Sequence, residues 1–320
     1  MNQEKNFRKE DLKKPIILVF IAVYIFAVVL VFLNEPNNAL TYIGLSIGIL
    51  FLCWLIIDLT KKIKVQDIEI KRPGLELIFG LLILIIWDYL PLPKIDFGDK
   101  WNIGLIIKKT IIFVGLPFMF LKFRKNSLAS MGLTSKDWKK NLWVGFVVFL
   151  ALAIPNAFLV GNTGGEILSG KYSAPQVGIG LFSSFIYFFL MAGFSEEFFF
   201  RAFIQTRISY LLKSSVSGVL ITSLIFGLGH IQGIMQWYPG ITIAEAFCRA
   251  FFLQTFIGIM FGVLWERTRN LIPCVFIHSG VDGLNNLFSI IAKLGLELLR
   301  LTMAIVNTGF SVKFEVLSIE

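Results

Sequence analysis

Charged residues are scarce in this sequence of 320 residues, and it lacks the long polar stretches that would cover a soluble protein. Asp, Glu, Lys and Arg make up 16% of the residues, whereas hydrophobic residues make up 56%. The mean hydropathy of +0.76 leaves too little polar surface for a soluble globule of this size. The scarcity of charge therefore excludes a soluble enzyme and predicts a multi-pass membrane protein.

Cysteine is also scarce, and the basic residues form no groove. The three cysteines, Cys53, Cys248 and Cys274, are odd in number and lie in or beside apolar sequence. We therefore expect buried thiols and no disulfide framework. The net charge is +9, but Lys and Arg fall mostly in short segments between apolar runs, and no basic, aromatic-interleaved groove is apparent. We expect no nucleic-acid partner.

What the sequence has instead is a series of long apolar runs. A helix rises about 1.5 Å per residue, so about 20 apolar residues cross a bilayer. We expect an all-α fold, a polytopic transmembrane bundle of eight to nine helices in contact with membrane lipid. The expected spans are 15–33, 40–59, 74–90, 103–121, 141–160, 177 to about 207, 217–232, 251–265 and 272–291.

Two of these runs carry local signals. The first ends at Asn34, Glu35 and Pro36 without small residues at a cleavage position, so we interpret it as an uncleaved span and not a signal peptide. Lys108 and Lys109 interrupt the fourth run. We expect these two side chains to reach out to a membrane interface.

Basic residues are concentrated in every second polar segment. The basic segments are 61–72, 122–140, 201–213 and 267–269. By contrast, segment 34–39 has no Lys or Arg, and segment 161–176 has one. Under the positive-inside rule this alternation predicts a cell-membrane protein with a cytoplasmic N-terminus.

Two adjacent carboxylates, Glu196 and Glu197, follow a long apolar run. A charged group in hydrocarbon costs roughly several kcal/mol unless it is paired or used in chemistry. The two histidines of the chain, His230 and His278, also lie in apolar segments. Seventeen residues separate Lys213 from Glu196 on one side and from His230 on the other. A helical hairpin that turns near Lys213 would therefore bring Glu196 and His230 to the same depth.

The buried polar groups also pair within helices, because residues four apart share a helix face. The pairs with this spacing are Glu197 with Arg201, Phe226 with His230, and His278 with Asp282. We expect Arg201 to balance the charge of Glu197 and to fix the backbone that presents Glu196. Any one of these residues alone could be a packing or solvated residue, and it is the joint order and spacing that indicate a site.

This set of groups suits hydrolysis of a peptide bond by water. A carboxylate and an imidazole at one depth can share a water molecule, with Glu196 as the base and His230 orienting or helping to deprotonate the water. The second imidazole, His278, would stabilise the oxyanion, with Asp282 holding or assisting it. The partner of such a site is a peptide or protein substrate.

The three motifs resemble those of the CAAX protease and bacteriocin-processing (CPBP, or Abi) family, intramembrane endopeptidases related to the type II CAAX prenyl endopeptidase. The motifs are Glu196-Glu197-x-x-x-Arg201, Phe226-x-x-x-His230 and His278-x-x-x-Asp282. The resemblance covers about residues 140 to 290. It implies that Glu196 and His230 activate water and that His278 with Asp282 forms the oxyanion hole.

The third motif departs from the family in one respect. In the family this motif often ends in Asn, whose amide can donate a hydrogen bond to an oxyanion. An ionised Asp282 can only accept. We therefore expect either that Asp282 is protonated or that it orients His278. On this basis we divide the chain into N-terminal helices with a cytoplasmic connector (1–140), a catalytic helical core (141–292) and a C-terminal tail (293–320).

Other chemistries fit the sequence less well. No His-Glu-x-x-His motif occurs, so we expect no cofactor, although Glu196, His230 and His278 could bind a divalent metal such as zinc. Ser195 lacks a nucleophile elbow, and Cys274 is interpreted as packing. The non-enzymatic alternative is a membrane scaffold or transporter that uses the buried charges. The sequence is compatible with three kinds of substrate: a CAAX peptide, a bacteriocin or pheromone precursor, and an envelope protein.

Overall fold

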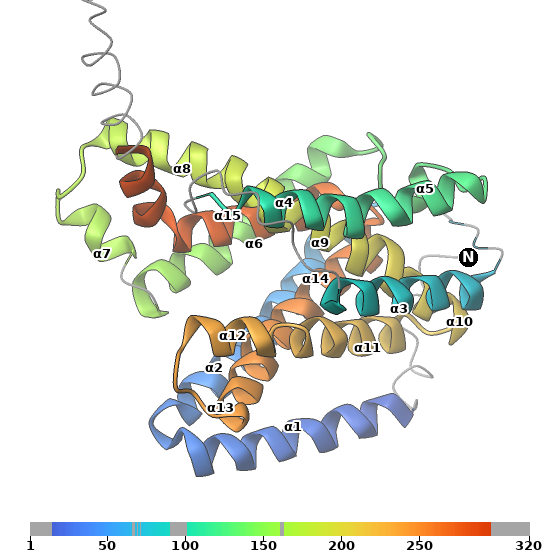
Figure 1. Cartoon of the computed structure of the whole chain (residues 1–320), viewed down its shortest axis with the longest axis horizontal. Coiled ribbons are helices and arrows are strands. Elements are labelled where there is room, and N and C mark those ends of the chain that lie inside the picture. Colours follow the sequence, from blue (N-terminus) through green and yellow to red (C-terminus); the bar gives the residue numbers. More distant parts are fainter. Residues whose placement is uncertain are drawn as a thin grey trace, which may run out of the picture.

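The computed structural model describes residues 15–65, 68, 70, 72–89, 101–160 and 163–295, and all regular structure in this part is helical (Figure 1). The α-helices are α1 (Pro15–Asn34), α2 (Pro36–Leu59), α3 (Pro73–Tyr89), α4 (Ile103–Lys109), α5 (Leu116–Phe123), α6 (Trp138–Pro155), α7 (Thr163–Leu168), α8 (Ala174–Phe188), α9 (Phe194–Glu197), α10 (Thr206–Leu211), α11 (Ser215–Leu228), α12 (Ile231–Trp237), α13 (Ile243–Arg249), α14 (Phe256–Thr268) and α15 (Leu271–Asn285). Most of the predicted tail lies outside the described residues.

Short π-helical segments join several of these helices into longer rods. They are Thr110–Gly115, Asn156–Val160, Phe189–Gly193, Phe198–Gln205 and Ala250–Thr255. Within the described residues, the resulting rods that are long and apolar enough to span a membrane are Pro15–Asn34, Pro36–Leu59, Ile103–Phe123, Trp138–Phe158, Ala174–Leu211, Ser215–Trp237 and Ile243–Thr268.

The predicted all-α transmembrane bundle is confirmed. The seven long rods account for seven of the nine expected spans, and the other two correspond to shorter helices, Pro73–Trp87 and α15. Large apolar side chains such as Leu18, Leu40 and Phe182 remain exposed on the outer faces of the rods, as lipid contact requires. The chain is a multi-pass membrane protein.

The rod Ala174–Leu211 carries the two glutamates. It begins three residues before the predicted span because Ser173 and Gln176 form a capping box at its N-terminus. Its two π-helical segments lie directly before and after α9, which contains Glu196 and Glu197. π-Helical turns are rare, and they occur often at functional sites because they re-aim side chains.

The hairpin after this rod turns where the spacing predicts. α10 ends at Leu211, Lys213 adopts a left-handed backbone with φ 50°, and α11 begins at Ser215. The side chain of Ser214 caps α11 by accepting a hydrogen bond from the backbone of Ser217 at 3.2 Å. α10 and α11 pack against each other as an antiparallel pair.

Close helix contacts hold the central rods together. α14 is buried on nearly all sides and packs against α2 and α11, and α15 packs against α6 and α8. Glycines allow these approaches, since a Cβ on Gly258 would lie 3.2 Å from Ser223 and one on Gly145 would lie 3.0 Å from Pro273. Small residues play this part in membrane bundles because they let two backbones come near.

Candidate active site

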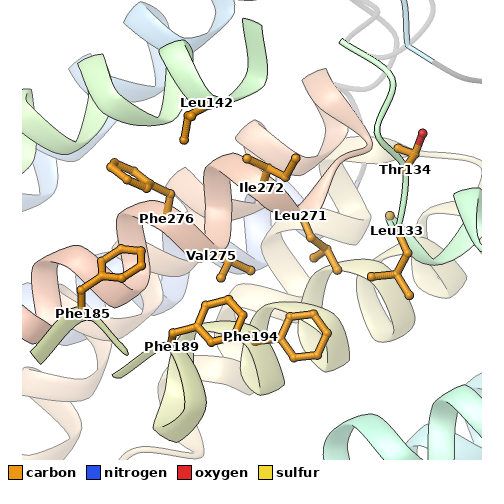
Figure 2. A pocket seen from close by; sticks show the side chains of 11 residues that line it. Leu133, Thr134, Leu142, Phe185, Phe189, Phe194, Leu271, Ile272, Val275 and Phe276 are labelled. Carbon is orange, nitrogen blue, oxygen red and sulfur yellow. The ribbon is translucent and has the colours of Figure 1, made fainter. Parts of the chain in front are cut away.

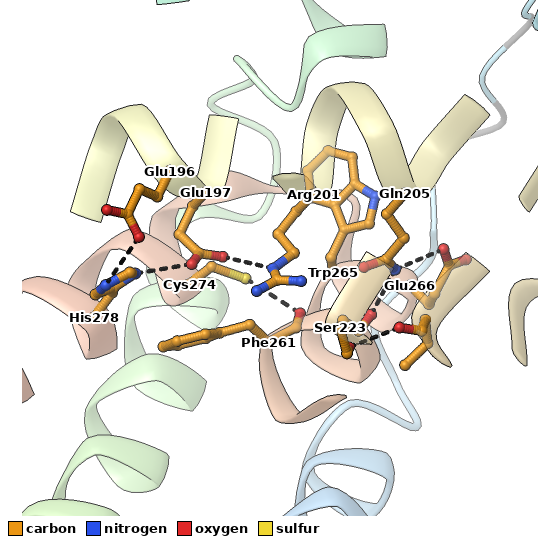
Figure 3. Close-up of polar contacts among 12 residues, drawn as sticks. Glu196, Glu197, Arg201, Gln205, Ser223, Phe261, Trp265, Glu266, Cys274 and His278 are labelled. Atoms are coloured by element: carbon orange, nitrogen blue, oxygen red, sulfur yellow. Dashed lines mark hydrogen bonds and ion pairs between the residues drawn. The ribbon is translucent and has the colours of Figure 1, made fainter. Parts of the chain in front are cut away.

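Glu197, Arg201 and His278 form a buried group in which Glu197 contacts both of the other side chains (Figure 3). Arg201 Nε donates to Glu197 Oε2 at 3.0 Å, and both side chains are completely buried. His278 Nδ1 lies 2.8 Å from Glu197 Oε1. Since an ionised carboxylate oxygen can only accept, Nδ1 carries a hydrogen. The other ring nitrogen, Nε2, faces away from Glu197 and is a second donor when the ring is protonated. The predicted pairing of Glu197 with Arg201 is therefore present.

Glu196 points toward Nε2 of the same imidazole, the ring nitrogen that does not contact Glu197. Its Oε2 lies 3.9 Å from His278 Nε2, and none of the described residues donates a hydrogen bond to this buried oxygen. The other carboxylate oxygen, Oε1, forms an ion pair with Lys109. One oxygen of Glu196 is thus held by a cation, and the other is directed at His278.

Lys109 was expected at a membrane interface, and that prediction is wrong. It ends α4, and the π-helical segment that follows packs against α9 and against Phe198–Gln205, which turns Lys109 inward. Its side chain is 13% exposed, and that of Glu196 is 8% exposed. Sequence spacing could not identify this pair, because 87 residues separate its members.

His230 reaches the site from the end of α11. Its Nδ1 lies 2.7 Å from the carbonyl oxygen of Phe226, so Nδ1 donates and Nε2 is left as an acceptor in the neutral ring. The Phe226 ring lies next to both imidazoles, with its centroid 4.6 Å from that of His230 and 6.4 Å from that of His278. Phe226 is therefore a wall of the site.

The spacing predicts Glu196 and His230 at the same depth, but the described residues contain no direct ion pair between them. The imidazole that forms the ion-pair contact with Glu196 is that of His278. The reason is local, since α11 ends at Leu228 and His230 occupies the position before α12, where its ring turns back to Phe226. His230 belongs to the same group of side chains, but at its edge.

Asp282 lies one turn after His278 and on the same face, as its spacing predicts. Its Oδ2 is 3.5 Å from His278 Nε2, and its side chain is 36% exposed. Nε2 of His278 is therefore approached by two carboxylates, one on the buried side and one on the exposed side. The exposed side is the direction from which water can reach the imidazole.

Aromatic rings enclose the charged centre. The guanidinium carbon of Arg201 lies 4.9 Å from the Phe226 centroid and 5.8 Å from that of Phe261. Phe261 also stacks on His278 with the centroids 5.2 Å apart. Cation–π contacts of this kind offset the cost of burying Arg201, whose two terminal nitrogens receive no hydrogen-bond partner from the described residues. Neither Phe261 nor Lys109 was identified from the sequence.

An apolar cavity of about 400 Å³ is lined in part by the glutamate rod and α15, the two elements that carry the charged group (Figure 2). Its walls come from the loop before α6, from α6, from the glutamate rod and from α15, and they are almost entirely apolar. The lining residues are Gly132, Leu133, Thr134, Leu142, Phe185, Phe189, Phe194, Leu271, Ile272, Val275 and Phe276. Its size is in the range of pockets that bind small ligands.

The metal alternative does not fit this arrangement. The described residues contain no group of three or more His, Cys, Asp and Glu side chains that could hold a metal ion. Of the possible ligands Glu196, His230 and His278 that the sequence offers, Glu196 has one oxygen bound by Lys109 instead of a metal. Ser195 and Cys274 are both buried, and they hydrogen bond to the carbonyl oxygens of Ala192 and Phe261, as packing residues do.

Comparison with known proteins gives one match. Residues 178–284 match the model of a family described as type II CAAX prenyl endopeptidase Rce1-like. No curated protein and no solved structure matches the chain. The resemblance drawn from the motifs is thereby confirmed, and the matched segment contains both glutamates, both histidines, Arg201 and Asp282 but not Lys109.

Proposed function

Taking the Rce1-like domain at residues 178–284 as the premise, we propose that this protein is an intramembrane endopeptidase that hydrolyses a peptide bond in a membrane-associated protein or peptide. The observation that supports this most directly is the buried Oε2 of Glu196, which faces His278 Nε2 at 3.9 Å. A water molecule that hydrogen bonds to both groups at ordinary lengths fits this separation.

In the proposed reaction, Glu196 Oε2 takes a proton from this water as the water oxygen attacks the carbonyl carbon of the substrate. The negative charge that develops on the carbonyl oxygen is stabilised by His278, whose ring is held by Glu197 at 2.8 Å. When the carbon–nitrogen bond breaks, Glu196 returns the proton to the departing amine. No step needs a covalent intermediate with the protein.

We assign supporting roles to His230 and Asp282. With Nδ1 donating to the Phe226 carbonyl, His230 Nε2 is available to accept a hydrogen bond from the attacking water and so to orient it. Asp282 Oδ2, at 3.5 Å from His278 Nε2, fixes the orientation of that ring from the exposed side. This is the second of the two roles considered for Asp282 in place of Asn.

The apolar cavity is the place we propose for the apolar part of the substrate. Phe194 and Val275 in its wall belong to the same two elements as Glu196 and His278, the glutamate rod and α15, so a ligand there would lie against the helices that carry the reacting groups. The lipid of a prenylated CAAX peptide suits these walls, and so does an apolar segment of a bacteriocin, pheromone or envelope precursor. We propose the cell membrane as the location.

The test uses the purified full chain in proteoliposomes with an internally quenched farnesylated CAAX peptide. Glu196→Gln and His230→Ala should abolish cleavage, and Glu245→Gln should not, because Glu245 lies in an exposed capping box away from the site. Peptides from membranes of cells that express the wild type or Glu196→Gln, compared by mass spectrometry, extend the test to other substrates. Wild-type cleavage by Glu196→Gln, or a cellular phenotype that survives both site variants, would contradict the proposal and favour a scaffold.

A further inference from the structure

Lys109 enters the site from outside the segment that matches the family. It lies at the end of α4, 69 residues before the matched segment begins at residue 178, and the helices of the N-terminal part bring it to Glu196. The π-helical segment Thr110–Gly115 starts directly after it, so the helix widens at the point where its side chain turns inward.

The adjacent lysine shows that the direction of Lys109 is specific. Lys108 Nζ donates to the carbonyl oxygen of Trp87 at 2.9 Å and lies 4.4 Å from the Trp87 ring centroid. The two neighbouring side chains therefore leave the helix toward different partners. Lys109 contacts a group of the proposed active site, whereas the contact of Lys108 with Trp87 lies outside it.

The ion pair also decides which oxygen of Glu196 is available. A carboxylate that rotates freely can present either oxygen to the water. When an ammonium group binds one oxygen, the orientation of the carboxylate is fixed, and so is the direction of the other oxygen. With Oε1 bound to Lys109, Oε2 is the oxygen that faces His278 and that the described residues leave without a hydrogen-bond donor. The cation at the same time supplies the pairing that a buried carboxylate requires.

We propose that Lys109 is a positioning residue of the proposed hydrolase, which holds Glu196 by Oε1 so that Oε2 can activate water next to His278. This inference rests on the proposed function. It gives the N-terminal helices a direct part in the reaction, because the matched domain alone would leave Glu196 without its cation. Among the described residues, Glu196 forms ion-pair contacts with Lys109 through Oε1 and with His278 through Oε2, and His230 lies farther out in the same group.

The experiment measures kcat and KM for the farnesylated CAAX peptide in proteoliposomes. Lys109→Met removes the ammonium group. Lys109→Gln removes the charge and shortens the side chain by one atom, which takes the donor away from Oε1, and its polar amide serves as the test if Met is not tolerated. Lys108→Gln is the matched control on the neighbouring residue. Lys109→Arg restores the charge, and Glu196→Gln tests the proposed function itself.

We expect Lys109→Gln and Lys109→Met to lower kcat by about 10- to 100-fold with little change in KM, as misplacement of a reacting group does. Lys109→Arg should recover most of the lost kcat, and Lys108→Gln should stay within about twofold of the wild type. Wild-type kcat in Lys109→Gln, while Glu196→Gln is inactive, would overturn the inference and leave the proposed function intact. Wild-type activity in Glu196→Gln would overturn the proposed function.

Discussion

At the scale of single residues, the candidate site is a chain of pairings that runs from Arg201 through Glu197 and His278 to Asp282. Each link is a direct contact of 2.8 to 3.5 Å, and the chain passes from a fully buried end to a partly exposed one. Glu196 stands beside this chain with one oxygen bound to Lys109, and the other receives no hydrogen bond from the described residues. The two adjacent glutamates therefore have different surroundings, which suits one to a structural role and the other to chemistry.

The burial of Arg201 predicts that Glu197 is needed for stability more than Glu196 is. Glu197→Gln leaves a guanidinium that is 0% exposed without its carboxylate, and breaking a buried pair in this way costs on the order of 3 kcal/mol. Thermal unfolding in detergent should show a clear fall in Tm for Glu197→Gln and a smaller one for Glu196→Gln, because Lys109 is not fully buried. Equal Tm values would contradict this ranking.

Asp282 can be tested by two substitutions of different character. Asp282→Asn keeps an oxygen that accepts a hydrogen bond from His278 Nε2, so kcat should remain within about threefold of the wild type. Asp282→Leu removes the acceptor and should lower kcat by about tenfold or more. If Asn were as damaging as Leu, the charge of Asp282 and not its hydrogen bond would be what matters.

At the scale of elements, the glutamate rod and α15 must approach closely for Glu197 to meet His278. Gly193, directly before α9, allows this, since a Cβ there would lie 2.2 Å from Ser279 Oγ and 3.3 Å from two backbone atoms of α15. The π-helical segments on each side of α9 adjust which side chains face α15. The site is thus built at one close helix crossing.

Widening this crossing should impair the site. Gly193→Val pushes α15 away from α9, so we expect kcat to fall by about 10- to 100-fold. Gly178→Val is the control on the same rod, because a Cβ at Gly178 has no atom within 4 Å among the described residues. A kcat that is equal in the two variants would mean that the approach at Gly193 does not position the reacting groups.

The cavity between α6, the glutamate rod and α15 gives a second prediction for the elements. Leu142→Trp on α6 fills part of the cavity, so the KM for a farnesylated peptide should rise by about tenfold, as expected for the loss of one or two kcal/mol of apolar contact. Leu150→Trp is the control, since Leu150 lies exposed on the same helix. An unchanged KM in Leu142→Trp would place the apolar part of the substrate elsewhere.

At the scale of the whole molecule, the N-terminal helices are packed into the matched domain. α2 lies against α14, α3 lies against α10, and Glu76 of α3 pairs with the buried Arg207 at 2.9 Å. At the other end of the bundle, Glu35 pairs with Arg249 of α13 at 3.2 Å. Together with Lys109, these contacts make the first spans part of the structure that holds the site.

The orientation in the membrane can be measured by labelling single cysteines. The native thiols Cys53, Cys248 and Cys274 are buried, so their background reaction should be low. In intact cells, a cysteine at Ser169 should react with a membrane-impermeant maleimide, and one at Lys62 should be protected, because the basic segment 61–72 is expected in the cytoplasm. Both positions lie in exposed turns, and the opposite pattern would invert the proposed topology.

Much of the fold could be predicted from apolar runs because each span must satisfy its own backbone hydrogen bonds within the bilayer. The turn near Lys213 and the pairs Glu197–Arg201 and His278–Asp282 followed from spacing along a helix. The contact of Lys109 with Glu196 did not, because 87 residues separate the two in the sequence. The stacking of Phe261 on His278 did not either, because it depends on how α14 and α15 pack against each other. The π-helical turns also carry no simple sequence signal.

The sequence by itself determined that this is a helical membrane protein and which ionisable residues lie within its spans, since the composition and the helical period depend only on local order. The tertiary structure alone decided that the direct contact of Glu196 is with His278 and not with His230, and that Lys109 holds one of its oxygens. The reason is that the ends, bends and crossings of the helices set the directions of these side chains, and those features depend on how the rods pack against one another.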